Sequence, residues 1–122
     1  MKKAIGETGE KIARKYIKKA GMKLLEKNFR ALRGEIDIIA KDEDQLVFIE
    51  VKTNSTDHDI SPEMRVNFAK QKQINKVAQM YIQQKNCIDM DCRFDVIGVK
   101  LHQKGKHEIN HIKNAFWIQS EI

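Results

Sequence analysis

The sequence predicts an α/β domain in which helices flank a mixed sheet, in the order helix, three strands, helix, strand, strand. Two segments, residues 4–20 and the stretch from Phe68 onward, repeat apolar residues with the period of a helix. Residues 34–52 read as two apolar, β-branched strands joined by a polar run. The long helical connection after Lys52 is typical of a right-handed crossover between parallel strands. A chain of 122 residues fits one domain, residues 1–122.

The first helix is expected from about Ala4 to Ala20, closed by Gly21. Glu10 lies at the border of its apolar stripe. Spacing alone favours an ion pair with Arg14, four residues on. It leaves open a second reading, in which Glu10 reaches past the stripe toward the central strands. The stripe consists of Ile5, Gly9, Ile12, Ala13, Tyr16 and Ala20.

A strand over residues 22–30 precedes the central hairpin, in which each strand carries one carboxylate. If the hairpin is centred on the 43–44 peptide, Asp37 lies opposite Glu50 and Glu35 lies opposite Lys52. Directly opposed side chains share a face, with Cβ atoms roughly 5 Å apart. Two carboxylates at that distance repel unless a proton or a cation lies between them. Mg²⁺ is one candidate, and an ordinary hairpin neutralised by Lys52 is the other.

Residues 53–61 form a polar loop, and Ser61-Pro62 reads as an N-cap followed by the first helical residue. The stripe of this helix consists of Ile74, Val77, Ala78, Tyr81 and Ile82. Lys70, Gln71 and Lys72 occupy its early turns. Position alone indicates a solvated face there.

The last strands are expected at residues 93–101 and 108–112, with a turn between them. Asp95 is a third strand carboxylate, and the sequence does not relate it to the first two. Phe116 and Trp117 are expected to cover the core. The spacing of three histidines fits no standard zinc site and favours dispersed surface positions; they are His102, His107 and His111.

A net charge of +6 and a pI of about 9.3 favour polyanionic partners. Arg30 and Arg33 are expected to place basic groups near the entry to the acidic pocket, and a plain solvated loop is the alternative. The longest apolar run, residues 46–49, is far too short to span a membrane, and the N-terminus lacks the features of a signal peptide. Two cysteines with no second pair are expected to be reduced thiols, and the protein is expected in the cytoplasm.

The arrangement of Asp37, twelve further residues and then Glu50-Val51-Lys52 resembles the motif of PD-(D/E)xK nucleases, with Ile36 in place of the proline. Almost the whole chain resembles the YraN-like family, relatives of archaeal Holliday junction resolvases. The similar segments are GETGEKIARKYIKKAG, NFRALRGEIDIIAKD, LVFIEVKT, VNFAKQKQI, RFDVIGV and HIKNAF.

This resemblance implies a restriction-endonuclease-like core and a metal site formed by Glu10, Asp37, Glu50 and the carbonyl of Val51. It implies that these three acids act in catalysis with Lys52 and Gln71. The basic residues expected to contact nucleic acid are Lys11, Arg14, Arg30, Arg33, Lys70 and Lys72, of which Lys70 matches a family position.

The implied activity is a Mg²⁺-dependent endonuclease, with Mn²⁺ able to substitute, that cuts branched, flap or junction DNA in repair or recombination. A homodimer is expected by analogy with resolvases, and no membrane association is expected. One alternative is a nucleic-acid-binding module with weak or lost catalysis. Another is a structural protein whose acids form ion pairs.

Overall fold

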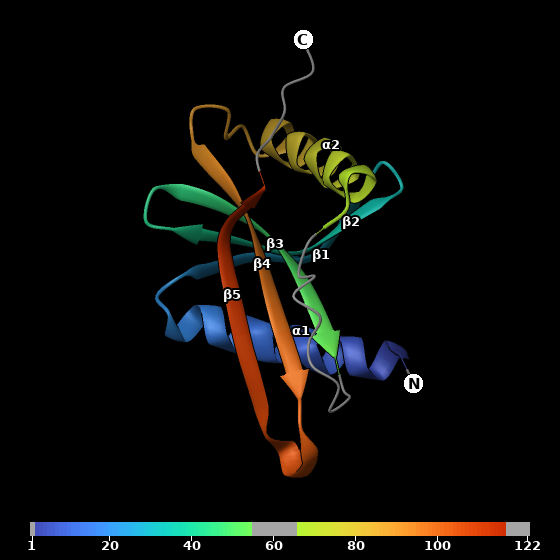
Figure 1. The fold of residues 1–122 in the computed structure, drawn as a ribbon. Coiled ribbons are helices and arrows are strands. Elements are labelled where there is room, and N and C mark those ends of the chain that lie inside the picture. Colours follow the sequence, from blue (N-terminus) through green and yellow to red (C-terminus); the bar gives the residue numbers. More distant parts are fainter. Residues whose placement is uncertain (1, 55–65, 117–122) are drawn as a thin grey trace.

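The computed structural model describes residues 2–54 and 66–116, with side chains from residue 3 (Figure 1). It confirms the α/β class and the predicted order of elements. The elements are α1 (Lys2–Lys19), β1 (Lys23–Ala31), β2 (Gly34–Asp42), β3 (Gln45–Asn54), α2 (Phe68–Gln84), β4 (Asp91–Leu101), the 3₁₀ helix η1 (Gln103–Gly105) and β5 (His107–Phe116).

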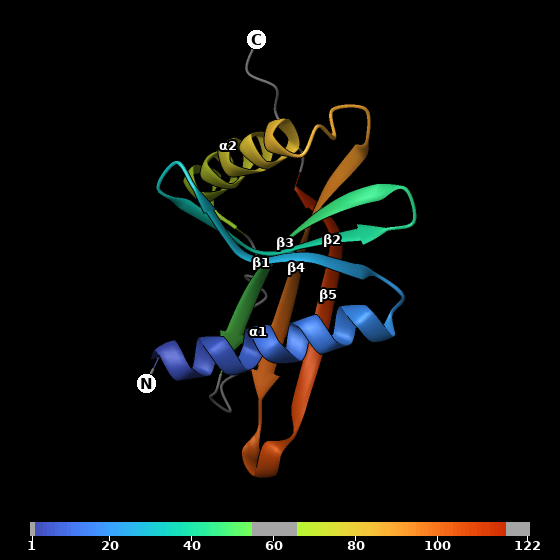
Figure 2. The same ribbon diagram turned by 180° about the vertical axis from the view of Figure 1, so that it is seen from behind.

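One five-stranded sheet has the order β1-β2-β3-β4-β5. Its neighbours are antiparallel except β3 and β4, which are parallel as the crossover through α2 requires. The two helices lie on opposite sides of the sheet, as Figures 1 and 2 show. The core is therefore split into two clusters, one under each helix.

The helix ends follow local chemistry. Gly21, at φ +95°, closes α1, and the N–H of Met22 donates to the carbonyl of Ile17 over 2.9 Å. The Asn67 side chain caps α2 by accepting from the N–H of Lys70 over 2.9 Å. The predicted Ser61-Pro62 start lies outside the described residues.

The predicted register of the central hairpin is confirmed, because Ile38 pairs with Ile49 and Asp42 with Gln45. The ladder stops at Ile38 and Ile49. From there β2 continues beside β1, and β3 continues beside β4 as far as Asn54. The predicted pairing of Glu35 with Lys52 is therefore wrong, because the sheet forks before it reaches them.

The expectation of surface positions is wrong for His111. Strand alternation turns its side chain toward α1, where Nε2 lies 2.8 Å from Oδ2 of Asp95 and Nδ1 lies 3.0 Å from the Tyr16 hydroxyl. Asp95 is fully buried, and Nε of Arg93 lies 3.1 Å from its Oδ1. Burial acts to raise the pKa of Asp95, but hydrogen bonds from His111, Arg93 and the N–H of Asn114 outweigh burial and lower it. This cluster joins α1, β4 and β5.

Two smaller expectations are met. Phe116 ends β5 and stacks on Phe94 with ring centroids 4.8 Å apart, whereas Trp117 lies outside the described residues. Cys87 and Cys92 are free thiols.

Within the described residues, neither helix has the length and apolar character that a membrane crossing would need.

Candidate active site

The central feature of the site is a carboxyl pair at the fork of the sheet. The hairpin register, continued by one residue, sets Asp37 opposite Glu50, and their carboxyl groups share a hydrogen bond. Oδ2 of Asp37 also accepts the N–H of Val51 over 2.8 Å. Because the β2–β3 ladder ends at the fork, the N–H of Val51 is available to a side chain. Its hydrogen bond fixes the orientation of the Asp37 carboxyl group.

The electrostatics of the pair differ from those of a surface carboxylate. Asp37 is only 9% exposed, and burial is the main cause that raises its pKa to about 8. The hydrogen bond and the negative charge of Glu50 raise this pKa further, whereas the N–H of Val51 lowers it. Near neutral pH the pair therefore holds a proton between two oxygens that could instead bind a cation.

A third acid approaches from α1. The side chain of Glu10 interacts electrostatically with Asp37 and Glu35, and burial is the main cause that raises its pKa. Oε1 of Glu10 accepts a hydrogen bond of 2.7 Å from Nδ2 of Asn28, which acts to lower that pKa. The interpretation in which Glu10 turns toward the sheet is the one that the structure supports, since its carboxylate accepts the hydrogen bond from Asn28 on β1.

Gly9 explains how α1 comes close enough to deliver Glu10. A Cβ atom at Gly9 would overlap the side chain of Thr53 on β3. No larger residue fits between the helix and this strand in the observed packing. The small residue preceding Glu10 therefore sets the distance between α1 and the fork.

Asn28 is a site residue that the sequence reasoning did not single out. It lies on β1 between the Lys27–Ile38 and Phe29–Ile36 pairs, and so beside Asp37, with φ at +50°. A left-handed residue inside a strand is rare, and asparagine tolerates this conformation better than most residues. The signal in the sequence was an asparagine inside an otherwise strand-like segment.

Asp37 and Glu50 offer the hard oxygen donors that Mg²⁺ prefers. In the part of the chain that the structure describes, no three His, Cys, Asp or Glu side chains gather tightly enough to form a metal site by themselves. The structure thus brings two predicted ligands into contact and leaves Glu10 nearby, held by Asn28. The Val51 carbonyl stays a predicted ligand, and its N–H has the separate role of holding Asp37.

The predicted lysine and glutamine residues occupy different positions around the pair. Lys52 lies two residues after Glu50 on β3, beside Gly98 of β4. Lys70 on α2 places Nζ 3.8 Å from Oε2 of Glu50. Gln71 follows Lys70 on α2, and its Nε2 donates to the carbonyl of Val66 over 2.7 Å.

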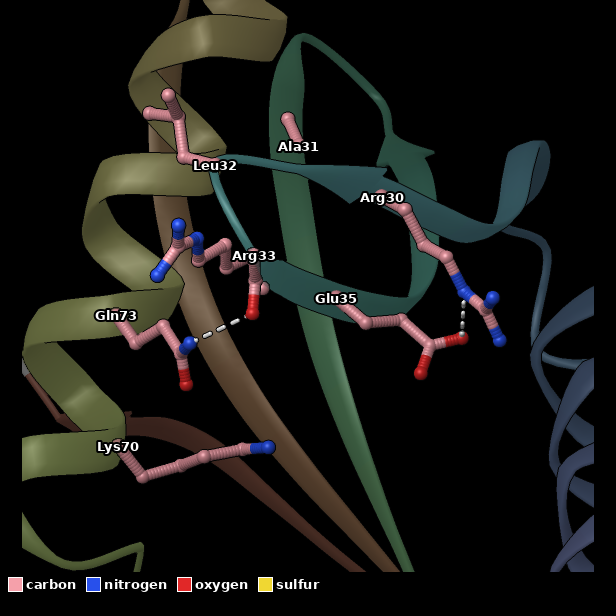
Figure 3. Close-up of a pocket in the computed structure, with 8 residues that line it drawn as sticks. Arg30, Ala31, Leu32, Arg33, Glu35, Lys70 and Gln73 are labelled. Carbon is pink, nitrogen blue, oxygen red and sulfur yellow. Dashed lines mark hydrogen bonds and ion pairs between the residues drawn. The ribbon is translucent and has the colours of Figure 1, made fainter.

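Three of the six predicted nucleic-acid contacts line one pocket beside the acids, with a volume of about 580 Å³ (Figure 3). They are Arg30, Arg33 and Lys70. The pocket is also lined by Ala31, Leu32, Gly34, Glu35 and Gln73. Lys72 lies instead over the Phe68 ring at 4.9 Å, and Lys11 and Arg14 lie on α1.

Fold and site together define the class: an α/β protein with a mixed five-stranded sheet that forks at a buried, proton-sharing carboxyl pair. The profile of the uncharacterised protein family UPF0102 matches residues 9–99, which include that pair. The chain belongs to this YraN-like family.

Relatives align with this chain almost end to end. A UPF0102 protein of Clostridium botulinum is 50% identical over 118 residues, covering 95% of this chain and 96% of the relative. One of Clostridioides difficile is 49% identical, covering 91% and 95%. One of Caldanaerobacter subterraneus subsp. tengcongensis is 46% identical, covering 94% and 96%.

Proposed function

We propose that this protein is a divalent-cation-dependent endonuclease that hydrolyses phosphodiester bonds of branched, flap or junction DNA. The observation that carries the proposal is the hydrogen-bonded pair of the buried Asp37 and the partly buried Glu50, beside a basic pocket. Buried carboxyl groups with strongly raised pKa values are concentrated at functional sites. An ion pair serving only stability would also join Asp37 to a cation, whereas the partners of Asp37 are the carboxyl group of Glu50 and the N–H of Val51.

Hydrolysis forms a bond between a water oxygen and phosphorus and breaks the bond from phosphorus to the leaving backbone oxygen. The water loses a proton and the leaving oxygen gains one. Asp37, Glu50, the Val51 carbonyl and Glu10 would hold Mg²⁺, with Mn²⁺ as a substitute. A bound Mg²⁺ supplies positive charge at the phosphate and lowers the pKa of a bound water.

The protein's own residues would act as follows. The Val51 N–H holds Asp37, and Asn28 holds Glu10, so that the carboxylates keep fixed orientations. Lys52, on the same strand as Glu50, orients the attacking water or stabilises the charge that grows on the phosphate. Lys70 places a second ammonium group 3.8 Å from the Glu50 carboxylate.

A second candidate is a nucleic-acid-binding module with weak or lost catalysis. The distance from Lys70 to Glu50 favours it, because an ammonium near the acid pair can replace a cation as the neutralising charge. In this reading the basic pocket binds DNA and the acid pair only adjusts the local charge. The two candidates predict the same binding and different chemistry.

The deciding experiment incubates the protein with branched, flapped, duplex and single-stranded DNA in Mg²⁺, Mn²⁺ or EDTA. Cleavage that needs the cation and disappears in the Glu50→Gln variant supports the nuclease. Glu43→Gln, at the exposed β2–β3 turn, is the matched control and should cut normally. DNA binding by wild-type protein without cleavage under any condition identifies the binding module.

The Lys52→Ala variant separates binding from chemistry. It should lose cleavage and largely keep its DNA affinity, because the lysine acts at one phosphate among many contacts. Lys41→Ala, an exposed lysine on β2, is the control. Wild-type cleavage by Lys52→Ala would refute the role given to this lysine.

A homodimer would suit a junction with two-fold symmetry. Light scattering of the protein with and without a four-way junction gives its stoichiometry. Two protomers per junction support the dimer, and one protomer per junction argues against it.

A further inference from the structure

The pocket beside the acid pair has fixed walls. It lies between α2 and the two-residue turn that joins β1 to β2 (Figure 3). Nε2 of Gln73 donates to the carbonyl of Arg33 over 2.9 Å, which ties the turn to the helix. A Cβ atom at Gly34 would come within 2.7 Å of the Val77 side chain, so the start of β2 is packed directly on α2. The pocket is therefore a built feature of the fold.

The charge of the pocket favours an anion. Arg30 pairs with Glu35 at 3.6 Å. The side chain of Arg33 makes no ion pair with any acid of the described residues. Lys70 lines the pocket and also reaches Glu50, so the pocket and the acid pair share a boundary. A phosphate bound at this boundary lies next to the proposed site of hydrolysis.

The turn contributes an apolar surface at an energetic cost. Leu32 is 57% exposed, and both Leu32 and Arg33 have left-handed backbones, with φ of +50° and +63°. Turns of this kind normally use Asn-Gly, because a side chain in this conformation costs roughly 1–2 kcal/mol. Such strain is concentrated where function requires particular side chains. Here it places an exposed leucine and an unpaired arginine next to each other.

We propose that this pocket holds one unpaired nucleotide next to the scissile phosphate. The nucleotide's phosphate contacts Arg33 and Lys70, and its base packs against Leu32. The pocket volume of about 580 Å³ is in the range of small-molecule sites, larger than a phosphate alone needs. The inference rests on the proposed nuclease function and gives it a physical basis for selecting DNA structure.

The selectivity follows from the energy of unstacking. A base inside a duplex must leave its stack to enter a pocket, which costs a few kcal/mol, and this cost is smallest for a base that is already unpaired. Flaps, bulges and branch points supply such bases and intact duplex does not. The preferred substrate is then DNA with an unpaired nucleotide beside the cut.

The test measures binding in EDTA, where the proposed chemistry cannot proceed. The probes are a flap DNA with 2-aminopurine at its first unpaired position and a fully paired duplex with 2-aminopurine at the same position. Wild-type protein should bind the flap about tenfold more tightly or better, which corresponds to about 1.4 kcal/mol. The fluorescence of the flap base should change on binding and that of the duplex base should not.

Two variants keep the turn conformation. Leu32→Asn replaces the apolar side chain with one that tolerates positive φ. Arg33→Gln removes the charge and keeps a long polar side chain. Each should abolish most of the flap preference and leave duplex affinity nearly unchanged. The controls are Ile88→Asn, another exposed apolar residue, and Lys104→Gln, another left-handed cation, in η1.

Equal affinity of wild-type protein for flap and duplex would overturn the pocket assignment, as would a full flap preference in both turn variants. Parallel cleavage assays in Mg²⁺ test the nuclease separately. A flap preference without cleavage retains the pocket and refutes hydrolysis. Cleavage that is indifferent to Leu32 and Arg33 retains hydrolysis and refutes the pocket.

Discussion

The side-chain amide of Asn28 donates a hydrogen bond of 2.7 Å to Glu10 and so joins β1 to α1 beside Asp37. This contact depends on a left-handed residue within a strand. The contact itself joins residues 18 positions apart in the chain and follows from the tertiary packing of α1 on the sheet. The contact makes Asn28 a positioning residue for the third acid of the site.

Replacing Asn28 with glycine should weaken Mn²⁺ binding about tenfold or more, the usual effect of losing a residue that orients a metal ligand. Glycine keeps the positive φ, so the free energy of unfolding should change little. Isothermal titration with Mn²⁺ and urea unfolding measure the two quantities. Asn86→Gly, at another asparagine with φ of +54°, is the control and should leave Mn²⁺ affinity unchanged. An unaltered affinity in Asn28→Gly would remove Asn28 from the site.

The metal-free protein should lose stability as the pH rises from about 4 to about 8. The pKa of Asp37 is raised from 3.8 to about 8, so in this window the folded protein holds a proton that the unfolded chain has released. The contribution of this group to the free energy of unfolding then falls by up to about 1.4 kcal/mol per pH unit, and is level above the folded pKa. Urea unfolding in EDTA across this range measures it. Asp37→Asn should flatten the profile, whereas Asp44→Asn, in the exposed β2–β3 turn, should not.

Two glycines of α1 should respond in opposite ways to alanine. Gly6 has no neighbouring atom within 4 Å of an added Cβ, so Gly6→Ala should stabilise the protein by about 0.5–1 kcal/mol. Gly9→Ala should destabilise it, because the added Cβ overlaps Thr53 and pushes α1 away from β3. Thermal unfolding gives both signs. Equal effects would mean that the approach of α1 to β3 is not limited by Gly9.

Asp95→Asn should cost about 3–5 kcal/mol in the free energy of unfolding, since it removes the buried carboxylate that faces Nε of Arg93 and Nε2 of His111. Asp42, whose Oδ2 lies 3.0 Å from the same guanidinium, cannot replace the contact with Nε. Asp91→Asn, at an exposed position of the same strand, should change stability by less than about 0.5 kcal/mol. A small loss of unfolding free energy in Asp95→Asn would show that Arg93 and His111 do not need the charge of Asp95.

The pairing of Asp37 with Glu50 could be predicted because a strand period and one turn fix the register of a hairpin. The fork could not be predicted, since it depends on which neighbour each strand follows. Glu10 needed the tertiary approach of α1, which spacing along one helix does not contain.

The positions of His111 and Gln71 were also beyond sequence reasoning. His111 reaches Asp95 only through the register of β5 on β4 and the place of Tyr16 on α1. Gln71 turns to the Val66 carbonyl because that backbone group lies within reach before α2. The Leu32-Arg33 turn lacks the residues that mark such turns, so no local pattern predicts the pocket.

The shared proton at the fork has a consequence for how a polyanion could approach. With Asp37 neutral near pH 7, the site presents less negative charge to an incoming phosphate than its acids would carry if all were ionised. Electrostatic repulsion is thereby reduced before any cation binds. A divalent cation that binds there as proposed would displace this proton to solvent, so the fork would pass from a proton to a cation without first exposing two bare carboxylates.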